Sequence, residues 1–373
     1  MAHRLQQPLP TRSISGFGKR NIPEFFDKDS REFALLLHGD SGVLLRDLPE
    51  HSIDVCVTSP PYWAQRGYDA ESGLGQEDSP EAYATHLCEI LDGLKHVLKE
   101  TGSLWLNIGD TYQNKNLSGA PWRVALCLGT RGWILRNAVV WDKAKGYPCN
   151  AKDKLRNTYE MLFHFVLSRD YYYDLDAIRN APGQPSYRNG HIVTPTGVSG
   201  TKYREQILTS PSLSSSERKA ALKALDEALR KVEAGEMPDF RMIVRGCQRA
   251  THSDQPEFSG RAREMAEKGF YVLPYHRAGT KPGDVWKIIP EDEWRTDDHY
   301  AVFPTELCEI PVRATCPRGG VLIDPFAGTG TALVAAIREG RRAVGIDTSK
   351  RYLKIAEERL RPVIEQATQG NLF

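Results

Sequence analysis

The tetrapeptide Ser59-Pro60-Pro61-Tyr62 follows directly after the short, mostly apolar run of residues 53–58. Such a run indicates a buried strand, and two successive prolines end a strand in a stiff, extended turn. The turn presents a hydroxyl group, backbone carbonyl oxygens and an aromatic ring together. Hydroxyl and carbonyl oxygens accept hydrogen bonds from an amino group, and an aromatic side chain stacks on a flat ring. The tetrapeptide therefore predicts a binding site for a flat molecule that carries an amino group.

A second motif lies far downstream, where a predicted strand ends in an acid and a glycine-rich turn follows. Asp324 ends the apolar run, and Gly328 and Gly330 stand in the turn that leads into the next helix. Glycine allows the backbone to approach a ligand closely. The next predicted strand, residues 342–346, ends in Asp347, and an acid at that place suits a ribose diol. The turn departs from the dinucleotide-binding pattern, because a leucine stands three residues after Gly330.

Together the two motifs resemble those of the DNA amino-methyltransferases that use S-adenosyl-L-methionine. The proline motif comes first, then a variable insertion and then the glycine motif, which is the order of the β group of these enzymes. The resemblance covers roughly residues 31–180 and 284–360. It implies that a methyl group passes from S-adenosyl-L-methionine to the exocyclic amino group of a base that is flipped out of double-stranded DNA.

The resemblance also implies roles for individual residues. The lone pair of an exocyclic amino group is delocalised into the base, and acceptors that bind its hydrogens localise that lone pair. Ser59 Oγ and the Pro60 carbonyl are candidates for this task, and Tyr62 would stack on the base. The implied catalytic residues are Ser59, Pro60, Pro61 and Tyr62, and the implied cofactor-binding residues are Asp40, Phe303, Pro304, Asp324, Phe326, Gly328, Gly330 and Asp347. Residues 106–110, 157–160 and 299–304 match further family segments beside the active site.

The first residue of the proline motif bears on which base is methylated. Adenine enzymes of the family more often carry aspartate there, and cytosine-N4 enzymes more often carry serine. Ser59 therefore favours the amino group at N4 of cytosine. Methylation of adenine at N6 is the first alternative, and a non-catalytic DNA-binding module of the same fold is the second. An RNA or small-molecule methyltransferase is a further alternative.

Apolar segments of strand length alternate with segments of helical spacing along most of the chain. The pattern predicts strands over residues 32–38, 53–57, 103–108, 133–141, 159–167, 321–323 and 342–346, and helices over residues 80–98, 121–128 and 332–338. This alternation indicates an α/β fold with a doubly wound, mostly parallel sheet, and the resemblance implies a Rossmann-like methyltransferase fold. We expect a flexible N-terminal arm over residues 1–30, a catalytic half over 31–179 and a cofactor-binding half over 284–373.

Residues 180–283 interrupt this pattern and predict an inserted target-recognition region. The first part is rich in proline, glycine, serine and threonine, and a helix over 217–234 follows three serines that can cap it. The segment holds 16 Lys and Arg against 11 Asp and Glu, an excess of five positive charges. A local basic face binds DNA through counterion release even where the whole chain is nearly neutral.

Bulk properties limit the remaining classes of function. The net charge is +1, so any basic surface must be local. The seven cysteines are scattered without a CxxC pair, which argues for reduced thiols, a cytoplasmic location and no metal site. No apolar run approaches the roughly 18 residues that a membrane span needs, so we expect no membrane association. Besides double-stranded DNA, the resemblance leaves a homodimer and a cognate restriction nuclease open as partners.

Overall fold

The computed structural model describes residues 14–15, 18–65, 73–144, 151–181, 186–188, 191–193, 200–247, 260–290 and 303–369. The chain divides into two units, one formed by Met1–Ala177 with Gly283–Phe373 and the other by Ile178–Pro282. We refer to these as unit 1 and unit 2. In the described parts of both units, no helix combines the length and the apolar character that a membrane crossing requires.

Within the described residues, unit 1 is built on a nine-stranded sheet with the order β1-β2-β15-β14-β3-β4-β8-β7-β13. The strands are β1 (Ile14–Ser15), β2 (Ala34–His38), β3 (Ile53–Thr58), β4 (Leu98–Ile108), β7 (Ile134–Asp142), β8 (Tyr159–Val166), β13 (Val285–Lys287), β14 (Val321–Asp324) and β15 (Arg342–Asp347). Strand β8 is antiparallel to both of its neighbours, and the other neighbouring strands are parallel. The predicted doubly wound, mostly parallel α/β sheet is confirmed.

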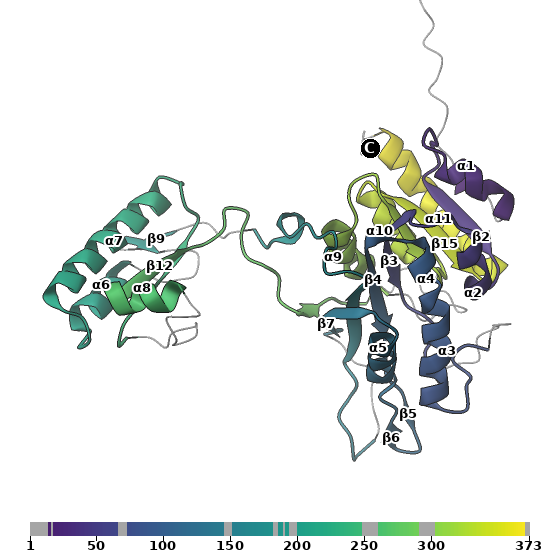
Figure 1. Cartoon of the computed structure of the whole chain (residues 1–373), viewed down its shortest axis with the longest axis horizontal. Helices are drawn as coiled ribbons and strands as arrows, with labels where there is room; N and C mark the ends of the chain where they lie inside the picture. Colours follow the sequence, from purple (N-terminus) through teal and green to yellow (C-terminus); the bar gives the residue numbers. More distant parts are fainter. Residues whose placement is uncertain are drawn as a thin grey trace, which may run out of the picture. The chain divides into compact units, whose positions relative to one another are not determined.

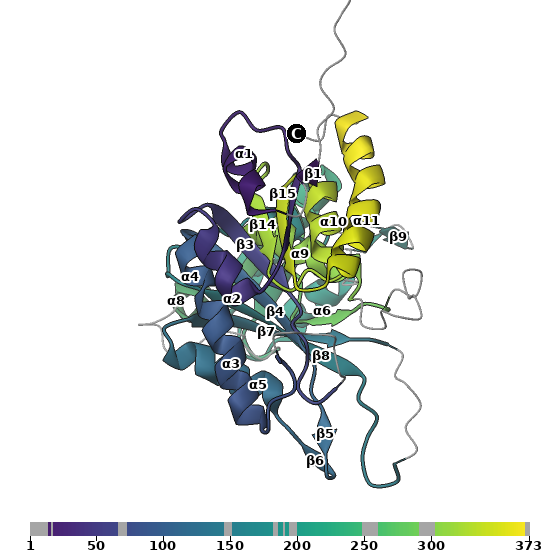
Figure 2. The ribbon, with the colours of Figure 1, turned by 90° about the vertical axis from the view of Figure 1, so that its right-hand side faces the viewer.

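Helices cover both faces of the sheet (Figure 1). One face carries α2 (Ser41–Leu44), α3 (Pro80–Asp92), α4 (Leu94–Val97) and α5 (Ala120–Thr130), and the other carries α9 (Thr305–Thr315), α10 (Thr331–Arg338) and α11 (Lys350–Gln369). Figure 2 shows the strands between these two groups of helices. The shorter elements are α1 (Ile22–Phe26), β5 (Tyr112–Gln113), β6 (Asn116–Leu117) and the 3-10 helices η1 (Lys19–Asn21), η2 (Leu45–Asp47) and η3 (Asp176–Ile178).

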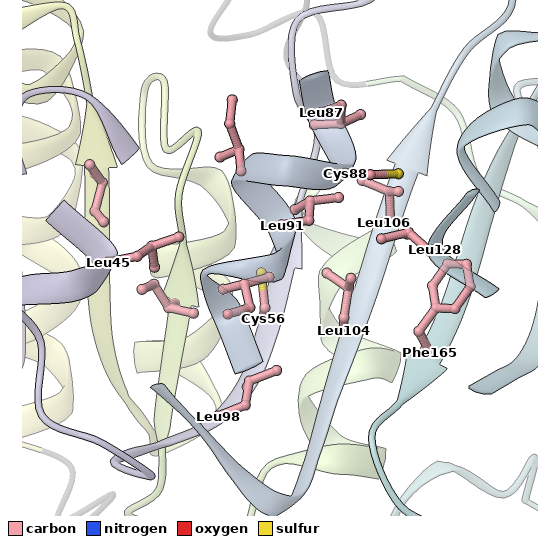
Figure 3. Packing of buried hydrophobic residues seen from close by; sticks show 14 of the residues in the cluster. Leu45, Cys56, Leu87, Cys88, Leu91, Leu98, Leu104, Leu106, Leu128 and Phe165 are labelled. Carbon is pink, nitrogen blue, oxygen red and sulfur yellow. The ribbon is translucent and has the colours of Figure 1, made fainter. Parts of the chain in front are cut away.

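Neighbouring side chains along most strands of the sheet enter two separate cores. In β14, Ile323 packs into the core beneath α2 to α5, whereas Leu322 packs into the core beneath α9 to α11. Figure 3 shows part of the first core, where Leu91 of α3 lies beside β4, the strand that carries Leu104 and Leu106. Apolar runs that are buried on both faces are what a covered parallel sheet requires.

The order of the strands reverses at β14, and this places the two sequence motifs side by side. The chain runs from β14 through α10 to β15 on one side, while β3 lies on the other side. Leu322 pairs with Val55 and Ile323 pairs with Cys56 in parallel register. The carboxyl ends of β3 and β14 therefore meet at the same edge, and such a reversal point is where ligands bind in open α/β sheets.

The structure corrects two predictions for unit 1. The flexible arm predicted over residues 1–30 is wrong for its second part, because α1 buries Ile22 and Phe25. The single helix predicted over residues 80–98 ends at Asp92 in α3, and α4 and then β4 follow. At this break a Cβ atom on Gly93 would lie 3.0 Å from a methyl carbon of Leu45, so the backbone runs close against the neighbouring 3-10 helix.

Unit 2 has a core of its own. Its elements are β9 (Ser186–Arg188), β10 (His191–Val193), α6 (Gly200–Thr209), α7 (Ser215–Glu233), β11 (Phe240–Val244), α8 (Gly260–Lys268) and β12 (Phe270–Pro274). The predicted cap is confirmed, since Ser214 and Glu217 form a reciprocal capping box at the start of α7. Asn180 and Thr280 exchange two backbone hydrogen bonds near the ends of the unit. Unit 2 and the predicted insertion, residues 180–283, cover nearly the same stretch, and its role in recognising DNA stays a prediction.

Candidate active site

A hydrogen bond joins the ends of β3 and β14 directly. Thr58 is the last residue of β3, and its Oγ1 donates to Asp324 Oδ1 over 2.6 Å. Both side chains are buried. The proline motif begins one residue after Thr58, and the glycine motif begins at Asp324, so this bond ties the two motifs into one site.

The end of β3 carries a network of polar side chains, to which β4, β8 and the segment after β7 also contribute. Tyr62 is 9% exposed, and its hydroxyl lies 2.8 Å from Glu160 Oε2, 3.1 Å from Asn107 Oδ1 and 3.1 Å from Ser59 Oγ. Ser59 Oγ also donates to Asn107 Oδ1 over 3.2 Å. The second carboxylate oxygen of Glu160 accepts from Lys143 Nζ. We call these five residues the β3-tip network.

Backbone contacts hold the proline turn in place around this network. The Tyr83 hydroxyl of α3 donates to the Pro61 carbonyl over 2.9 Å. A Cβ atom on Gly109 would lie only 2.7 Å from Tyr62 Cε2, so glycine is needed for the aromatic ring to lie against the end of β4. Within the described residues, no donor reaches the Pro60 carbonyl. Its oxygen can therefore accept a hydrogen from a ligand.

The end of β14 carries a buried carboxyl group with one oxygen in use. Asp324 Oδ1 accepts from Thr58 Oγ1 and from the Phe326 backbone N–H, the latter over 3.0 Å. Among the described residues, no partner reaches the buried Oδ2. Burial raises the pKa of Asp324 from 3.8 to about 7, and the nearby Asp347 adds to this rise, whereas the two hydrogen bonds oppose it. A cation beside Oδ2 would favour the ionised form.

The glycine turn is shaped for close backbone approach. Gly328 and Gly330 have φ angles of +51° and +80°, which favour glycine. The Gly328 N–H donates to Asp347 Oδ2 over 2.8 Å, which joins the turn to the end of β15. Buried Arg359 of α11 donates to the Thr329 carbonyl oxygen over 2.8 Å, and this bond fixes the glycine turn to α11. Burial raises the pKa of Asp347, and its bonds to the Gly328 and Ser349 N–H groups oppose this rise.

Comparison with known proteins identifies the family. The sequence model of the DNA methylase family that comprises N6 and N4 methyltransferases matches residues 53–358. The chain is 33% identical over 385 residues to the type II methyltransferase M.SfiI of Streptomyces fimbriatus, with 86% of this chain and 89% of the relative covered. The chain belongs to this family. It is an S-adenosyl-L-methionine-dependent DNA methyltransferase of the N4/N6 amino type, which confirms the resemblance seen in its motifs.

Further similarities agree with this assignment. The type II methyltransferase M.Cfr9I of Citrobacter freundii is 27% identical over 356 residues, with 88% of this chain and 87% of the relative covered. The solved PvuII DNA methyltransferase, described as cytosine-N4-specific, aligns with a TM-score of 0.53 and 15% identity. That alignment covers 91% of this chain and 94% of the other, and at this identity it shows a shared fold alone.

The residues of the DNA methyltransferase fit its methyl donor. The unpaired oxygen of Asp324 can accept from the ammonium group of the methionine moiety, and Asp347 at the next strand end can accept from ribose hydroxyls. Phe326 is half-buried and offers an aromatic ring beside the turn. Asp40 is the N-cap of α2, and the next residue, Ser41, donates to the Pro325 carbonyl. The loop after β2 therefore reaches the glycine motif.

The remaining predicted donor-binding residues lie at the start of α9. Pro304 is the N-cap of this helix, and α9 packs against β3 and β4. Phe303 is half-buried and packs on the core beneath α9 to α11. Residues 299–302, which the resemblance also implicated, lie outside the described residues. Contact of Phe303 and Pro304 with the methyl donor stays a prediction.

Several residues of this site were not singled out by the sequence. Thr58, Lys143 and Arg359 were missed, although Thr58 directly precedes the proline motif. Asn107 and Glu160 stand in two segments that resembled the family, but their joint contact with Tyr62 was not expected. Polar residues at the ends of buried strands were the available signal, since a buried polar group needs a partner.

Proposed function

We propose that this protein methylates cytosine at N4 in a specific sequence of double-stranded DNA. The observation that carries the proposal is the direct bond between Thr58 and Asp324, which holds the base-binding motif next to the donor-binding motif. Ser59 supports cytosine over adenine, because the first position of its motif holds a hydroxyl instead of a carboxylate. Adenine N6 is the alternative acceptor.

In this proposal, Ser59 Oγ and the Pro60 carbonyl accept the hydrogens of the amino group. Their pull localises the nitrogen lone pair and aims it at the donor, an effect of position and preorganised dipoles. Bound S-adenosyl-L-methionine supplies a methyl group on a sulfonium centre. Asp324 binds the ammonium end of the donor, and Tyr62 stacks on the flipped base. Stacking of roughly 1–3 kcal/mol per base offsets part of the cost of extruding it.

Unit 2 is the proposed target-recognition region. Arg241 on β11 and Arg261 and Arg263 on α8 are exposed, and such side chains can reach phosphates or base edges. Arg245 is different, because it donates to the Ser212 carbonyl oxygen and forms an ion pair with Glu217 inside the unit. We therefore assign Arg245 to the fold of unit 2 and the other three arginines to DNA binding.

The decisive experiment combines methyl transfer with analysis of the product. Purified protein is incubated with labelled S-adenosyl-L-methionine and duplex DNA, and the DNA is then digested to nucleosides for mass spectrometry. We expect N4-methylcytosine, and long-read sequencing of DNA from expressing cells should place it in one sequence context. N6-methyladenine would contradict the choice of base, and no label in any DNA would contradict the catalytic role.

Ser59→Ala tests the acceptor group itself. Removal of one aligned hydrogen-bonding group lowers a catalytic rate by about 100- to 1,000-fold. We expect a loss of this size in the single-turnover rate, with unchanged affinity for S-adenosyl-L-methionine. The matched control is Ser52→Ala, at an exposed turn before β3. Ser349 is unsuitable as a control because its backbone N–H donates to Asp347. Equal activity of both variants would remove Ser59 from the site.

A further inference from the structure

A charge pair stands at the end of the hydrogen-bond chain that runs from Ser59 through Tyr62. Lys143 follows β7 and Glu160 belongs to β8, and they form a salt bridge with side chains only 23% and 11% exposed. Lys143 Nζ also lies 4.9 Å from the centre of the Trp141 ring. A charge pair so poorly exposed to water is weak evidence for stability, because desolvation offsets much of its attraction. Its position at the end of a hydrogen-bond chain suggests another role.

The carboxylate of Glu160 fixes the direction of the neighbouring hydrogen bonds. A carboxylate only accepts, so the Tyr62 hydroxyl donates its single proton to Glu160 Oε2, its shortest contact at 2.8 Å. Bonds to an ionised acceptor are stronger than bonds between neutral groups, so this choice prevails over donation to Asn107. The Tyr62 oxygen is then left as an acceptor towards Ser59.

Asn107 has a fixed orientation as well. Its Nδ2 donates over 3.2 Å to the Met161 carbonyl, which can only accept. Asn107 Oδ1 therefore faces Ser59 and Tyr62. Both neighbours that Ser59 Oγ meets inside the network are acceptors, so the hydroxyl proton of Ser59 is directed into the network. The lone pairs of Ser59 Oγ are left for an amino group.

We infer that Glu160, held by Lys143, is a positioning residue that makes the Ser59 hydroxyl an acceptor for the target amino group. A serine hydroxyl can donate or accept, whereas the task proposed for it requires acceptance alone. The hydrogen bonds from Ser59 to Tyr62 and from Tyr62 to Glu160 prevent Ser59 from donating to the base, because each hydroxyl proton is directed towards the carboxylate. The inference rests on the proposed role of Ser59, but it holds for the amino group of either cytosine or adenine.

Glu160→Gln tests this inference with almost no change in size. The amide oxygen would turn towards Lys143, which only donates, and its NH2 group would face Tyr62. The Tyr62 proton would then point either at Ser59 Oγ, which would lose Tyr62 as an acceptor, or at Asn107 Oδ1, which Ser59 would have to share. We expect the single-turnover rate of methyl transfer to fall by about 10- to 100-fold, as for loss of a hydrogen bond to a charged group. Affinities for S-adenosyl-L-methionine and DNA should stay unchanged.

A double-mutant cycle with Tyr62→Phe separates positioning from general damage. Phenylalanine keeps the ring but removes the hydroxyl through which Glu160 acts, and Ser59 can still donate to Asn107 Oδ1. In this background Glu160→Gln should change the rate by no more than about twofold, the usual limit of additivity. A loss of the same size in both backgrounds would overturn the inference, as would full activity of the single variant.

The control and the fallback use the same assay. Glu357→Gln on α11 breaks an exposed ion pair with Arg361 and changes the net charge equally, so it should leave the rate unchanged. If Glu160→Gln does not fold, as judged by thermal unfolding, Lys143→Gln replaces it in the same cycle. Absence of methyl transfer by the wild-type protein would contradict the proposed function instead, because the inference compares variants of an active enzyme.

Discussion

The ends of β3 and β14 both carry polar side chains, but they differ in whether these groups have hydrogen-bond partners within the protein. In the β3-tip network, Ser59, Tyr62 and Glu160 each have partners within the protein. At the end of β14, Asp324 is fully buried, yet no partner among the described residues reaches its Oδ2. A satisfied network holds its geometry before any ligand arrives, whereas an unsatisfied carboxyl group favours the ligand that completes it.

Under the proposed function, this difference corresponds to different parts of the two ends in catalysis. Groups that must act on the transition state benefit from being oriented in advance, which describes the β3-tip network. A group that only binds the donor can instead remain partly protonated until a cation arrives. Burial raises the pKa of Asp324. A raised pKa is what a carboxyl group has when it stays partly protonated until a cation binds beside it. Three substitutions test the comparison.

Asp324→Asn should have the largest effect. Between pH 3.8 and about 7 the folded protein holds a proton on Asp324 that the unfolded chain has released. The free energy of unfolding of the wild type should therefore fall as pH rises through this window, by about 4 kcal/mol at most. The side-chain amide of the variant does not titrate, so the substitution should remove this dependence. Thermal and denaturant unfolding between about pH 4 and 8 would measure it.

The same variant should weaken binding of S-adenosyl-L-methionine by about 10- to 100-fold, the range for a lost hydrogen bond to a charged group. In the wild type, affinity should fall below about pH 7 because Asp324 becomes protonated there. Titration calorimetry across pH would detect both effects. Asp226→Asn, at an exposed site on α7, is the control. Equal pH profiles for wild type and Asp324→Asn would contradict the proposed role of this carboxyl group.

Gly109→Ala disturbs the satisfied end instead. The added methyl group would meet Tyr62 Cε2 at 2.7 Å and Glu160 Oε1 at 3.2 Å. Overpacking of this kind destabilises a protein by about 1–3 kcal/mol. We expect a lower rate of methyl transfer with unchanged affinity for the donor, measured by single-turnover kinetics and calorimetry. Gly129→Ala in α5 meets no atom within 4 Å and should be tolerated. Loss of donor binding in Gly109→Ala would show that the two ends are not separable.

Thr58→Val should have the smallest effect and probes the bond between the ends. Valine keeps the shape of threonine but cannot donate to Asp324 Oδ1. The loss of this neutral donor should cost about 1 kcal/mol. It should also raise the pKa of Asp324 further, because this bond opposes the effect of burial. The pH midpoint of donor binding should therefore shift upward, and an unchanged midpoint would contradict the coupling.

The sequence predicted those parts of the site that belong to local motifs. Ser59 and Asp324 stand next to turns whose prolines and glycines mark the ends of strands. The sheet followed from alternating apolar segments. The contacts of Glu160 with Tyr62 and Lys143 could not be predicted, because they depend on the order and register of β4, β8 and β7. Spacing along one strand does not reveal which strand becomes its neighbour.

The predicted element boundaries that were wrong also have physical explanations. Residues 98–102 read as the end of a helix because Lys99, Glu100 and Gly102 are unusual in a strand. They nevertheless extend β4, whose first part pairs with β3 through Ile53 and Leu98. In the N-terminal segment, the apolar residues are scattered among polar ones without a clear period. Tertiary packing, which buries Ile22 and Phe25, outweighed local preference in that segment.

The paired backbone bonds between Asn180 and Thr280 have a consequence for how such proteins diversify. A segment whose two ends are fastened together can be exchanged for one of another length, since longer loops add little closure entropy. The apolar core of unit 2 lies within this segment and would be exchanged together with it. With the DNA-reading role proposed for unit 2, one recombination event would change the sequence preference while the register of the large sheet, and the chemistry at its edge, stayed the same.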